Sequence, residues 1–445
     1  MSEHHVGRKS RSRHRVAAFL AVVGLATVGL RGIPAQAAAS DGTLDTAFNH
    51  GGFDGQVMAV ALQSDGKILV GGYFTHFDPN GTPIATNEIA RLNRDGTLDT
   101  SFNQSGFYGG VSSIAVQSDG KILVGGDLTS FAVGQTVTPV GHIARLNGDG
   151  SLDTSFNYGG VDAQVRVIAV QSDGKILIGG DFNVFDPGPG GTEVDHIARL
   201  NGDGSLDTSF NHGGFGGWVG AIAVQPDGNI LVGGGIGSFD PNGTPTALNY
   251  IARLTSSGAL DHSFSLRGFD ADVRALAIQP NGRIVVVGSF THFDPEGTPI
   301  TVNQIARLNS DGSLDVGFNH GGFDDRMYAV AVQPDGHILV GGQGSQFDPN
   351  STPVPINSFT RLNPDGTLDA PFNHGGAGTY GDGYAFAIQP DGRIIVGGSF
   401  PDFDPNGTPV RVNNLARLNG SVLPTTGTDP TPLLLLGVAL LGVGA

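Results

Sequence analysis

One phrase returns seven times along this chain at almost constant spacing. It consists of a short apolar run, a Gln-Ser/Pro-Asp/Asn-Gly turn and a second apolar run. Successive copies lie 54 residues apart in five steps and 56 residues apart in the last. A period of this length is typical of repeat architectures, in which each unit buries its core against its neighbours. The turn glycines are Gly66, Gly120, Gly174, Gly228, Gly282, Gly336 and Gly392.

Each repeat reads as four β-strands. In the first copy, the apolar runs 57–63 and 68–74 are joined by an Asp-Gly turn, which indicates a hairpin with a two-residue type I′ turn. After a longer loop, the segments 89–93 and 98–103 flank a second Asp-Gly turn. Outside the N-terminal region no long stretch shows the 3.6-residue period of a helix. Pairs of glycines such as Gly71 and Gly72 are expected to let neighbouring units approach closely.

Four antiparallel strands repeated seven times predict an all-β fold, a seven-bladed β-propeller over residues 41–420. Radial closure protects the sheet edges that an open stack of blades would expose. The Leu-Asp phrase of the fourth strand first occurs at Leu44-Asp45, before every other strand, whereas the last repeat stops at Asn419 without one. We therefore expect the N-terminal strand to complete the seventh blade, a pairing that a linear solenoid would not provide.

The repeat units resemble a known bacterial family. The phrases Ala-Val-Gln-Ser/Pro-Asp-Gly-Lys-Ile-Leu-Val-Gly-Gly and Ile-Ala-Arg-Leu-Asn-x-Asp-Gly-Ser/Thr-Leu-Asp-x-Ser-Phe-Asn are similar to the delta-sixty repeats. The resemblance covers roughly residues 41 to 420. It implies a propeller architecture and frequent presence on exported proteins, and it supplies no catalytic motif.

The N-terminal region has the features of a secretory signal peptide, assigned to residues 1–37. Basic residues precede the apolar run 16–30, and Ala35-Gln36-Ala37 offers small residues for signal peptidase. A membrane anchor is the alternative, but the run is shorter than the roughly 20 residues that span a bilayer. The basic residues before the run are Arg8, Lys9, Arg11, Arg13 and Arg15.

The C-terminal segment 421–445 resembles a cell-wall sorting signal of the LPXTG type. Its pentapeptide is Leu423, Pro424, Thr425, Thr426 and Gly427, and an apolar stretch follows it. The resemblance implies a Gram-positive cell wall, with sortase and peptidoglycan as partners. The family pattern ends in a basic tail, whereas no Lys or Arg follows Arg417 here. Either the sequence is truncated or anchoring is impaired; a disordered tail is the alternative.

The net charge of the chain limits the classes of partner that it can bind. The formal net charge is −17, and the leader contributes +5, which leaves −22 for the rest. This charge repels phosphate backbones, so we expect no nucleic-acid binding. The chain has no cysteine, which excludes disulfides, a thiol nucleophile and cysteine-based metal sites. We expect a monomer.

Features present in every copy are expected to serve every blade. One arginine per repeat precedes a Leu-Asp phrase, and we interpret the two as a charge pair within the blade. The Asn93-x-Asp95-Gly96-x-x-Asp99 phrase is similar to a calcium loop, although Arg91 stands at its first ligand position. An Asx turn explains the same residues, and calcium stays an open alternative. The arginines are Arg91, Arg145, Arg199, Arg253, Arg307, Arg361 and Arg417.

The candidate binding face is the side of the propeller that carries the longer loops and the links between blades. Asp and His residues in these segments could bind a cation or a polar glycan, although turn capping explains most of them. The copies that depart from the repeat, and the single tryptophan, are stronger candidates for a binding site. The candidate residues are His50, Asp78, His142, Asp186, His196, His212, Trp218, Asp240, Asp294, His320, Asp348, His374 and Asp404.

Three classes of function follow from the sequence. The first is an exported, wall-anchored binding or adhesion module whose ligand is a glycan or a protein. The second is a glycan hydrolase or lyase, which is disfavoured because glutamates are scarce and no asymmetric carboxylate pair stands out. The third is a structural wall protein without a ligand.

Overall fold

A computed structural model shows the fold of the repeat region. The chain divides into two compact units, residues 1–38 and 39–445, and all described residues belong to the second. The predicted signal peptide and sorting segment therefore lie outside the described residues. No helix within the described part is long and apolar enough to cross a membrane. The described residues are 41–48, 51–77, 81–102, 106–156, 159–186, 188–210, 213–239, 243–293, 297–318, 321–347, 352–373, 381–403 and 409–420.

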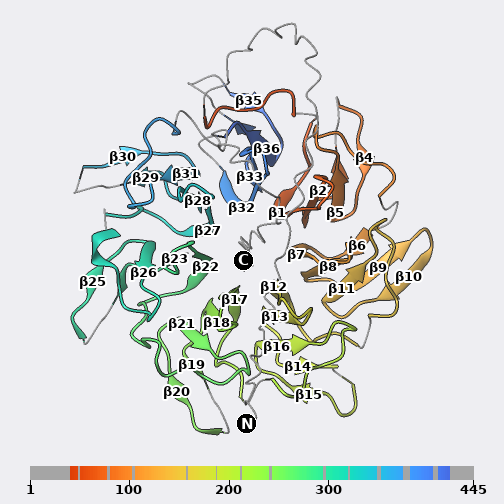
Figure 1. The fold of residues 1–445 in the computed structure, drawn as a ribbon. Coiled ribbons are helices and arrows are strands. Elements are labelled where there is room, and N and C mark those ends of the chain that lie inside the picture. Colours follow the sequence, from red (N-terminus) through yellow and green to blue (C-terminus); the bar gives the residue numbers. More distant parts are fainter. Residues whose placement is uncertain are drawn as a thin grey trace, which may run out of the picture. The chain divides into compact units, whose positions relative to one another are not determined.

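Seven antiparallel sheets surround a common axis, which confirms the predicted all-β, seven-bladed propeller (Figure 1). Each blade has three strands, and its first strand lies innermost. The middle strands are buried at nearly every position because they are covered on both faces. The blades are, in order, β1 (Gln56–Leu62), β2 (Ile68–Tyr73) and β5 (Ile89–Leu92); β7 (Val111–Val116), β8 (Ile122–Gly126) and β11 (Ile143–Leu146); β12 (Val165–Val170), β13 (Ile176–Gly180) and β16 (Ile197–Leu200); β17 (Val219–Val224), β18 (Ile230–Gly234) and β21 (Ile251–Leu254); β22 (Val273–Ile278), β23 (Ile284–Gly288) and β26 (Ile305–Leu308); β27 (Met327–Val332), β28 (Ile338–Gly342) and β31 (Phe359–Leu362); and β32 (Asp382–Ile388), β33 (Ile394–Ser399) and β36 (Leu415–Leu418).

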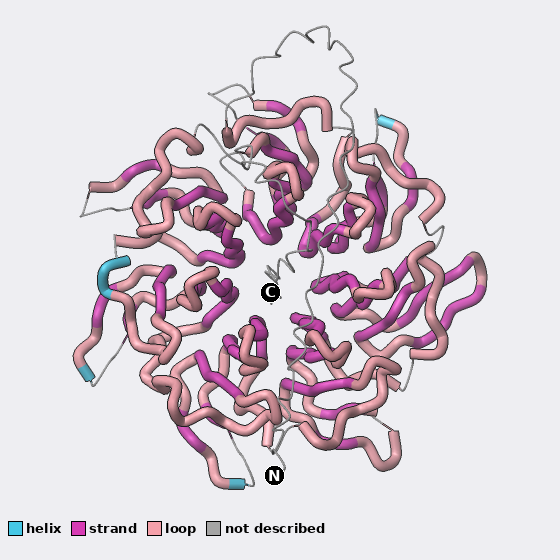
Figure 2. The backbone as a smooth tube through the Cα atoms, viewed as in Figure 1, coloured by secondary structure: helices cyan, strands magenta, loops and turns pink. Residues whose placement is uncertain are grey.

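A short second hairpin occupies the segment that the sequence predicts as a loop between the second and third strands. These hairpins lie toward the rim of the ring (Figure 2). In blade 1, Phe53 of the preceding link bridges to Phe77 of the hairpin, so links and long loops share one side of the molecule. A short 3-10 helix, η4 (Val316–Phe318), follows the third strand of blade 5. The hairpins are β3 (His76–Phe77) with β4 (Ile84–Ala85), β9 (Ser130–Val133) with β10 (Thr136–Pro139) and β6 (Gly106–Tyr108), β14 (Val184–Phe185) with β15 (Thr192–Glu193), β19 (Ser238–Phe239) with β20 (Thr246–Ala247), β24 (His292–Phe293) with β25 (Ile300–Thr301), β29 (Gln346–Phe347) with β30 (Val354–Pro355), and β34 (Asp402–Phe403) with β35 (Val410–Arg411).

The predicted fourth strand is much shorter than expected. It is reduced to one β-bridge per blade, such as Leu98 to Leu92 in blade 1. The chain turns away directly afterwards, because the carboxylate of Asp99 accepts hydrogen bonds from the backbone N–H (3.1 Å) and the hydroxyl (2.6 Å) of Ser101. This local turn competes with continued strand pairing.

The N-terminal segment closes the ring, as the position of the first Leu-Asp phrase predicts. Leu44 bridges to Leu418 in the last strand. The backbone N–H of Gly42 donates to the carbonyl of Asn419 and that of Asp45 donates to Arg417, both at 2.8 Å. The first described residues therefore supply the fourth position of the seventh blade.

The Asp-Gly hairpins are confirmed, but the predicted type I′ turn is wrong. Gly66 has a φ of +82°, whereas Asp65 is absent from the residues with positive φ. Hydrogen bonds from Gly66 N–H to Gln63 and from Gln63 N–H to Lys67 enclose a three-residue loop. This is the pattern of a type I turn followed by a left-handed glycine. The carboxylate of Asp65 stabilises it by accepting the N–H of Lys67 at 3.0 Å.

The two glycines after each middle strand have different roles. A Cβ atom on Gly71 would overlap the side chain of Val111 in the next blade, so this glycine permits the predicted close approach of blades. A Cβ atom on Gly72 would instead overlap the carbonyl oxygen of Gln56 in the same blade. Apolar side chains of neighbouring inner strands fill the interface between blades.

Candidate functional site

Every blade contains the predicted arginine–aspartate pair. The seven distances from arginine Nε to the carboxylate lie between 2.7 and 2.9 Å. In blade 3, Arg199 bonds Asp207, and its guanidinium lies 4.5 Å from the ring centroid of Phe210. Both charged side chains are largely buried. Equivalent arginine–phenylalanine contacts of 4.1 to 4.9 Å recur in all seven blades.

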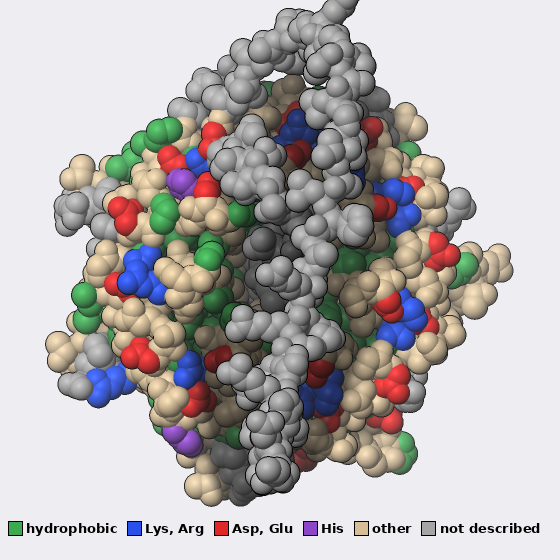
Figure 3. Space-filling view, viewed as in Figure 1, with side chains coloured by type: hydrophobic (Ala, Val, Ile, Leu, Met, Phe, Trp, Pro, Cys, Tyr) green, Lys and Arg blue, Asp and Glu red, His purple; other side chains and the backbone are tan. Residues whose placement is uncertain are grey.

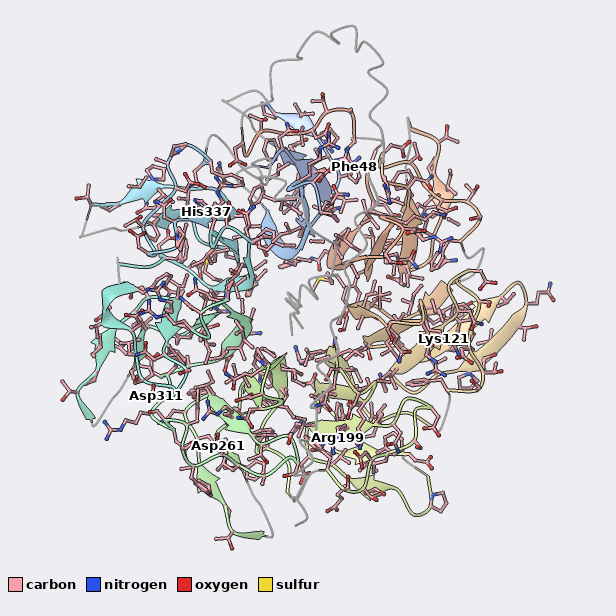
Figure 4. All side chains as sticks on the ribbon, viewed as in Figure 1. Phe48, Lys121, Arg199, Asp261, Asp311 and His337 are labelled. Carbon is pink, nitrogen blue, oxygen red and sulfur yellow. The ribbon has the colours of Figure 1, made fainter. Side chains whose placement is uncertain are left out.

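The same arginines also connect neighbouring blades. Arg199 donates through Nη1 to the carbonyl of Ser256 in the next blade at 2.5 Å. Arg361 bonds the carboxylate of Asp41 instead. In blade 7 the fourth position is filled by the N-terminal segment, so no turn connects it to the third strand. Figure 4 shows these charged side chains distributed around the ring, with Arg199, Asp261 and Lys121 labelled in three blades. The arginines therefore support the ring as a whole.

The electrostatics of the pairs also indicate a structural role. Burial by itself raises the pKa of Asp99, but hydrogen bonds from Lys67, Ser101 and Arg91 outweigh it and hold the pKa of Asp99 well below its ordinary value. The pKa values of Asp153 and Asp207 are lowered in the same way. These carboxylates are thus ionised and partnered in repeated surroundings, which leaves the arginine–aspartate set unsuited to a specific ligand site.

The calcium-like phrase is also explained by protein contacts. Asp95 accepts the N–H of Thr97 at 3.0 Å and its hydroxyl at 2.7 Å, while Asp99 bonds two cationic side chains. The part of the chain that the structure describes holds no group of three or more His, Asp or Glu side chains that could bind a metal ion. The Asx-turn interpretation accounts for this phrase.

Four of the predicted binding-face residues lie in the described part of the chain. His142 and His196 occupy the same position in blades 2 and 3, each with a left-handed backbone and a buried Nδ1 atom. Asp186 is exposed, and its N–H donates to the carbonyl of Gly160 at 2.8 Å. Trp218 lies at the start of the innermost strand of blade 4. The others lie outside the described residues: His50, Asp78, His212, Asp240, Asp294, His320, Asp348, His374 and Asp404.

A β-bulge interrupts all seven innermost strands at the same place. In blade 1 the pairing register shifts between Val57 and Ala59, which leaves Met58 as the extra residue. A bulge bends the strand and re-aims one side chain. The flanking positions are mostly small or apolar, but the bulge residue differs from blade to blade. The seven bulge residues are Met58, Ser112, Arg166, Gly220, Arg274, Tyr328 and Tyr384.

We call these bulge residues, together with Trp218, the axial cluster. Trp218 lies between the two arginines: the guanidinium carbon of Arg166 is 5.1 Å from its ring centroid, and that of Arg274 is 4.8 Å away. The indole lies against Gly220, where a Cβ atom would overlap it. Cation–π contacts of this kind are worth about 0.5 to 2 kcal/mol. The tryptophan therefore takes the place of the missing side chain in blade 4.

The two arginines also have carboxylate partners. Arg166 binds Asp181 through Nε and Nη2, with distances between 2.8 and 3.0 Å. Arg274 contacts Asp272 at 3.1 Å. Burial lowers the pKa of Arg274, although the charge of Asp272 opposes this effect. The result is a compact set of fixed, paired hydrogen-bonding groups.

The opposite arc of the axial cluster is aromatic. Met58, Tyr328 and Tyr384 pack together from blades 1, 6 and 7, and the two tyrosine rings are 5.7 Å apart. The hydroxyl of Tyr384 donates to Asp382 at 2.7 Å, and Gln343 donates to the same carboxylate at 3.1 Å. Burial, and next the hydrogen bond to Asp382, raise the pKa of Tyr384.

The axial cluster departs from sevenfold symmetry, and so does the rim of blade 2, where β6 adds a third strand to the hairpin. Elsewhere the charges are mixed: on the face shown in Figure 3, Lys and Arg side chains alternate with Asp and Glu. Sequence reasoning found Trp218 but missed the bulge residues. An alignment of the seven copies would identify the bulge residues. One column reads Met, Ser, Arg, Gly, Arg, Tyr and Tyr, between columns of mainly small or apolar residues.

Several solved structures are similar to this chain. The WD40 β-propeller domain of Doa1 is 15% identical, with a TM-score of 0.48, and the match covers 86% of this chain and 96% of that one. A catalytically inactive virginiamycin B lyase from Staphylococcus aureus with Quinupristin is 13% identical, with a TM-score of 0.48 and coverages of 83% and 97%. A chain of the Mitotic Checkpoint Complex is 14% identical, with a TM-score of 0.48 and coverages of 91% and 98%.

These likenesses carry no argument about function. A search of the curated proteins found no match. One family, described as a domain of unknown function (DUF5122) beta-propeller, matches seven segments of the chain: 63–102, 117–156, 171–210, 225–264, 279–318, 333–372 and 389–421. Each matched segment contains the turn between the first two strands, the middle strand and the third strand with its arginine. The first six segments also contain the aspartate of the pair, whereas Arg417 in the seventh pairs with Asp45. The chain therefore belongs to the DUF5122 β-propeller family.

Proposed function

We propose that this protein is a binding module that captures its ligand at the axial cluster. The observation that carries the proposal is the asymmetry of the seven bulge residues in a ring whose arginine–aspartate pairs repeat in every blade. Symmetric features serve every blade, whereas a site for one ligand needs copies that differ. Aromatic side chains with a few convergent polar groups are typical of ligand sites. The arginine–aspartate groups supply directed hydrogen-bond donors and acceptors, and the aromatic arc is apolar. Arg166, Tyr328 and Tyr384 are themselves largely buried in the propeller.

Trp218 makes the proposal directly testable. It is the only tryptophan in the chain, so intrinsic fluorescence reports on the axial cluster alone. We expect a glycan and surface-protein array probed with the full chain to yield binders that change this fluorescence on titration. Arg166→Ser should weaken such a binder at least tenfold, because Ser112 shows that serine is accepted at the same bulge. Binders whose affinity and fluorescence ignore Arg166 would contradict the proposal.

We also propose export and wall anchoring. The support is the leader-like residues 1–37, the resemblance of the repeats to delta-sixty repeats, and the pentapeptide Leu423 to Gly427. Incubation of the full chain with a purified sortase and a glycine nucleophile should cleave between Thr426 and Gly427 and attach the nucleophile to Thr426. A Thr426→Ala variant is the control. Mass spectrometry that finds no cleavage in the unaltered chain would remove the anchoring proposal.

A further inference from the structure

One residue of each blade stands at the junction with the next blade, directly before the third strand. Six of these seven residues have a left-handed backbone, with φ between 66° and 72°. This position lies beside the link that leads into the next blade. In blade 1, for example, the carbonyl of Asn87, next to Glu88, accepts the N–H of Phe107 in blade 2 at 3.2 Å. The junction residues are Glu88, His142, His196, Tyr250, Gln304, Ser358 and Asn414.

Side-chain amides at this position connect two blades. In blade 7, Asn414 accepts the N–H of Phe400 in its own blade at 2.9 Å and donates to the carbonyl of Phe53 in blade 1 at 3.1 Å. In blade 5, the amide nitrogen of Gln304 faces two carbonyl oxygens. In the amide orientation that satisfies both contacts, this nitrogen donates to the carbonyl of Asn303 at 2.9 Å and to that of Phe323 in the next blade. An amide suits the junction because it both accepts and donates.

Blade 1 places a carboxyl group where blades 5 and 7 have amides. Glu88 accepts the N–H of Phe74 at 2.9 Å, the same bond that Asn414 forms in blade 7. Glutamate and glutamine have the same length, so the second oxygen of Glu88 corresponds to the amide nitrogen of Gln304. From the repeat symmetry with Gln304 we infer that this oxygen is directed toward the carbonyl oxygens of Asn87 and Phe107. A carboxylate can only accept, whereas a protonated carboxyl donates one hydrogen bond.

We propose that Glu88 is a proton-dependent link between blades 1 and 2. When protonated, its hydroxyl donates to a carbonyl oxygen at the junction, as the amide of Gln304 does in blade 5. When ionised, it places a negative charge against those carbonyl oxygens, and the junction loosens. This inference is independent of the proposed binding function, because it rests on the amide contacts of blades 5 and 7.

The surroundings of Glu88 agree with the link. Burial raises the pKa of Glu88 to about 7, the N–H of Phe74 opposes the rise, and the charge of Asp54 adds to it. Hydrogen bonds to Asp54 from His76 and Thr75 outweigh burial and lower the pKa of Asp54, so this neighbour is ionised at neutral pH. Tyr73 is the other titratable group coupled to Glu88. Strand β6 of blade 2 contributes Gly106, Phe107 and the exposed Tyr108, and no acidic or basic side chain.

The sign of the pH effect follows from this raised pKa. Between the ordinary glutamate value of 4.5 and about 7, the folded protein holds a proton that the unfolded chain does not. Stability contributed by Glu88 is therefore present at acidic pH and is lost as the pH rises through 7. The neighbouring histidine junctions in blades 2 and 3 are unchanged in a Glu88 variant, so they cancel in the comparison.

Amide hydrogen exchange at Phe107 tests the link on the full chain. The unaltered protein and Glu88→Gln are compared at the same pH, so that intrinsic exchange rates cancel. At pH 8 we expect Phe107 to exchange about tenfold faster in the unaltered protein, which corresponds to the loss of one hydrogen bond of about 1.4 kcal/mol. At pH 5 the two rates should agree within about twofold, because the protonated carboxyl then donates a hydrogen bond as the amide does.

Two further variants make the test decisive. Gln304→Glu should transfer the same pH dependence to Phe323, whose N–H donates to Asn303 at 2.9 Å. Glu193→Gln changes an exposed glutamate on β15 and should leave both amides unaffected. Equal exchange of Phe107 in the unaltered protein and Glu88→Gln at pH 8, or a Gln304→Glu variant without pH dependence, would overturn the proposal.

Discussion

The arginine of each repeat acts at three points at once. Arg199 pairs with Asp207, stacks over Phe210 and donates to the backbone of the next blade at Ser256. Removing one member of a buried ion pair costs more than the pair contributes, because the other charge stays buried. At the residue scale, these arginines join neighbouring blades as well as the strands within a blade.

We expect Arg199→Leu to lower the free energy of unfolding by about 3 kcal/mol. Lys175 still contacts Asp207 at 2.5 Å, which keeps the loss at the lower end of the usual range. Arg411→Leu is the matched control: Arg411 bonds Asp402 at 2.7 Å but its side chain is 67% exposed, so less than about 1 kcal/mol should be lost. Urea denaturation of both variants measures the difference. Equal losses would show that the buried pair has no special role.

A second residue-scale effect concerns acid. Because hydrogen bonds outweigh burial and lower the pKa values of Asp99, Asp153 and Asp207, their contribution to stability is present above the ordinary aspartate pKa of 3.8. It is lost as the pH falls below 3.8 toward the folded values. We therefore expect the melting temperature to fall steeply below pH 4, and less steeply in Asp207→Asn. A melting temperature that is constant from pH 5 to pH 2 would contradict this account.

At the element scale, the sequence predicts the strands better than their irregularities. The two apolar runs around Gly66 predict a hairpin, and the hairpin forms. The turn type was wrong because Asp-Gly suits both a two-residue and a three-residue loop, and only the backbone angles distinguish them. The rim hairpins and the bulge at Met58 escaped prediction because short pairings and register shifts have no apolar period of their own.

The contact between neighbouring inner sheets gives an element-scale prediction. Gly71→Ala places a methyl group within the side chains of Val111 and Ile114 of blade 2. We expect a loss of about 1 to 3 kcal/mol, as for overpacked cores, measured by chemical denaturation. Gly188→Ala is the control because a Cβ atom there meets nothing within 4 Å. A neutral Gly71→Ala would show that the blades can move apart at no cost.

At the scale of the whole molecule, repeat symmetry explains both what the sequence predicts and what it misses. The period predicts the number of blades, and the displaced Leu44-Asp45 phrase predicts how the ring closes. Repeat symmetry does not single out functional residues in the loops, because most residues named there recur by duplication. The informative column lies within the innermost strands, where a bulge turns one side chain per blade out of the regular alternation.

Ring closure can be tested by truncation. A variant that begins at residue 49 loses the bridge of Leu44 to Leu418, the pair of Asp45 with Arg417 and the buried Phe48. Compared with a variant that begins at residue 41, we expect it to lose at least about 3 kcal/mol, the usual cost of removing a buried phenylalanine. Chemical denaturation of the two proteins measures this loss, and equal free energies of unfolding would contradict ring closure by residues 41–48.

The most direct test of the proposed site compares two surfaces of the same propeller with one bound ligand. Isothermal titration of an array-selected binder is carried out on the unaltered chain, on Arg166→Ser with Arg274→Ser, and on His142→Gln with Asp186→Asn. The account predicts at least a tenfold loss of affinity in the arginine variant and less than a twofold change in the loop variant. Affinity that is lost in the loop variant and retained in the arginine variant would contradict it.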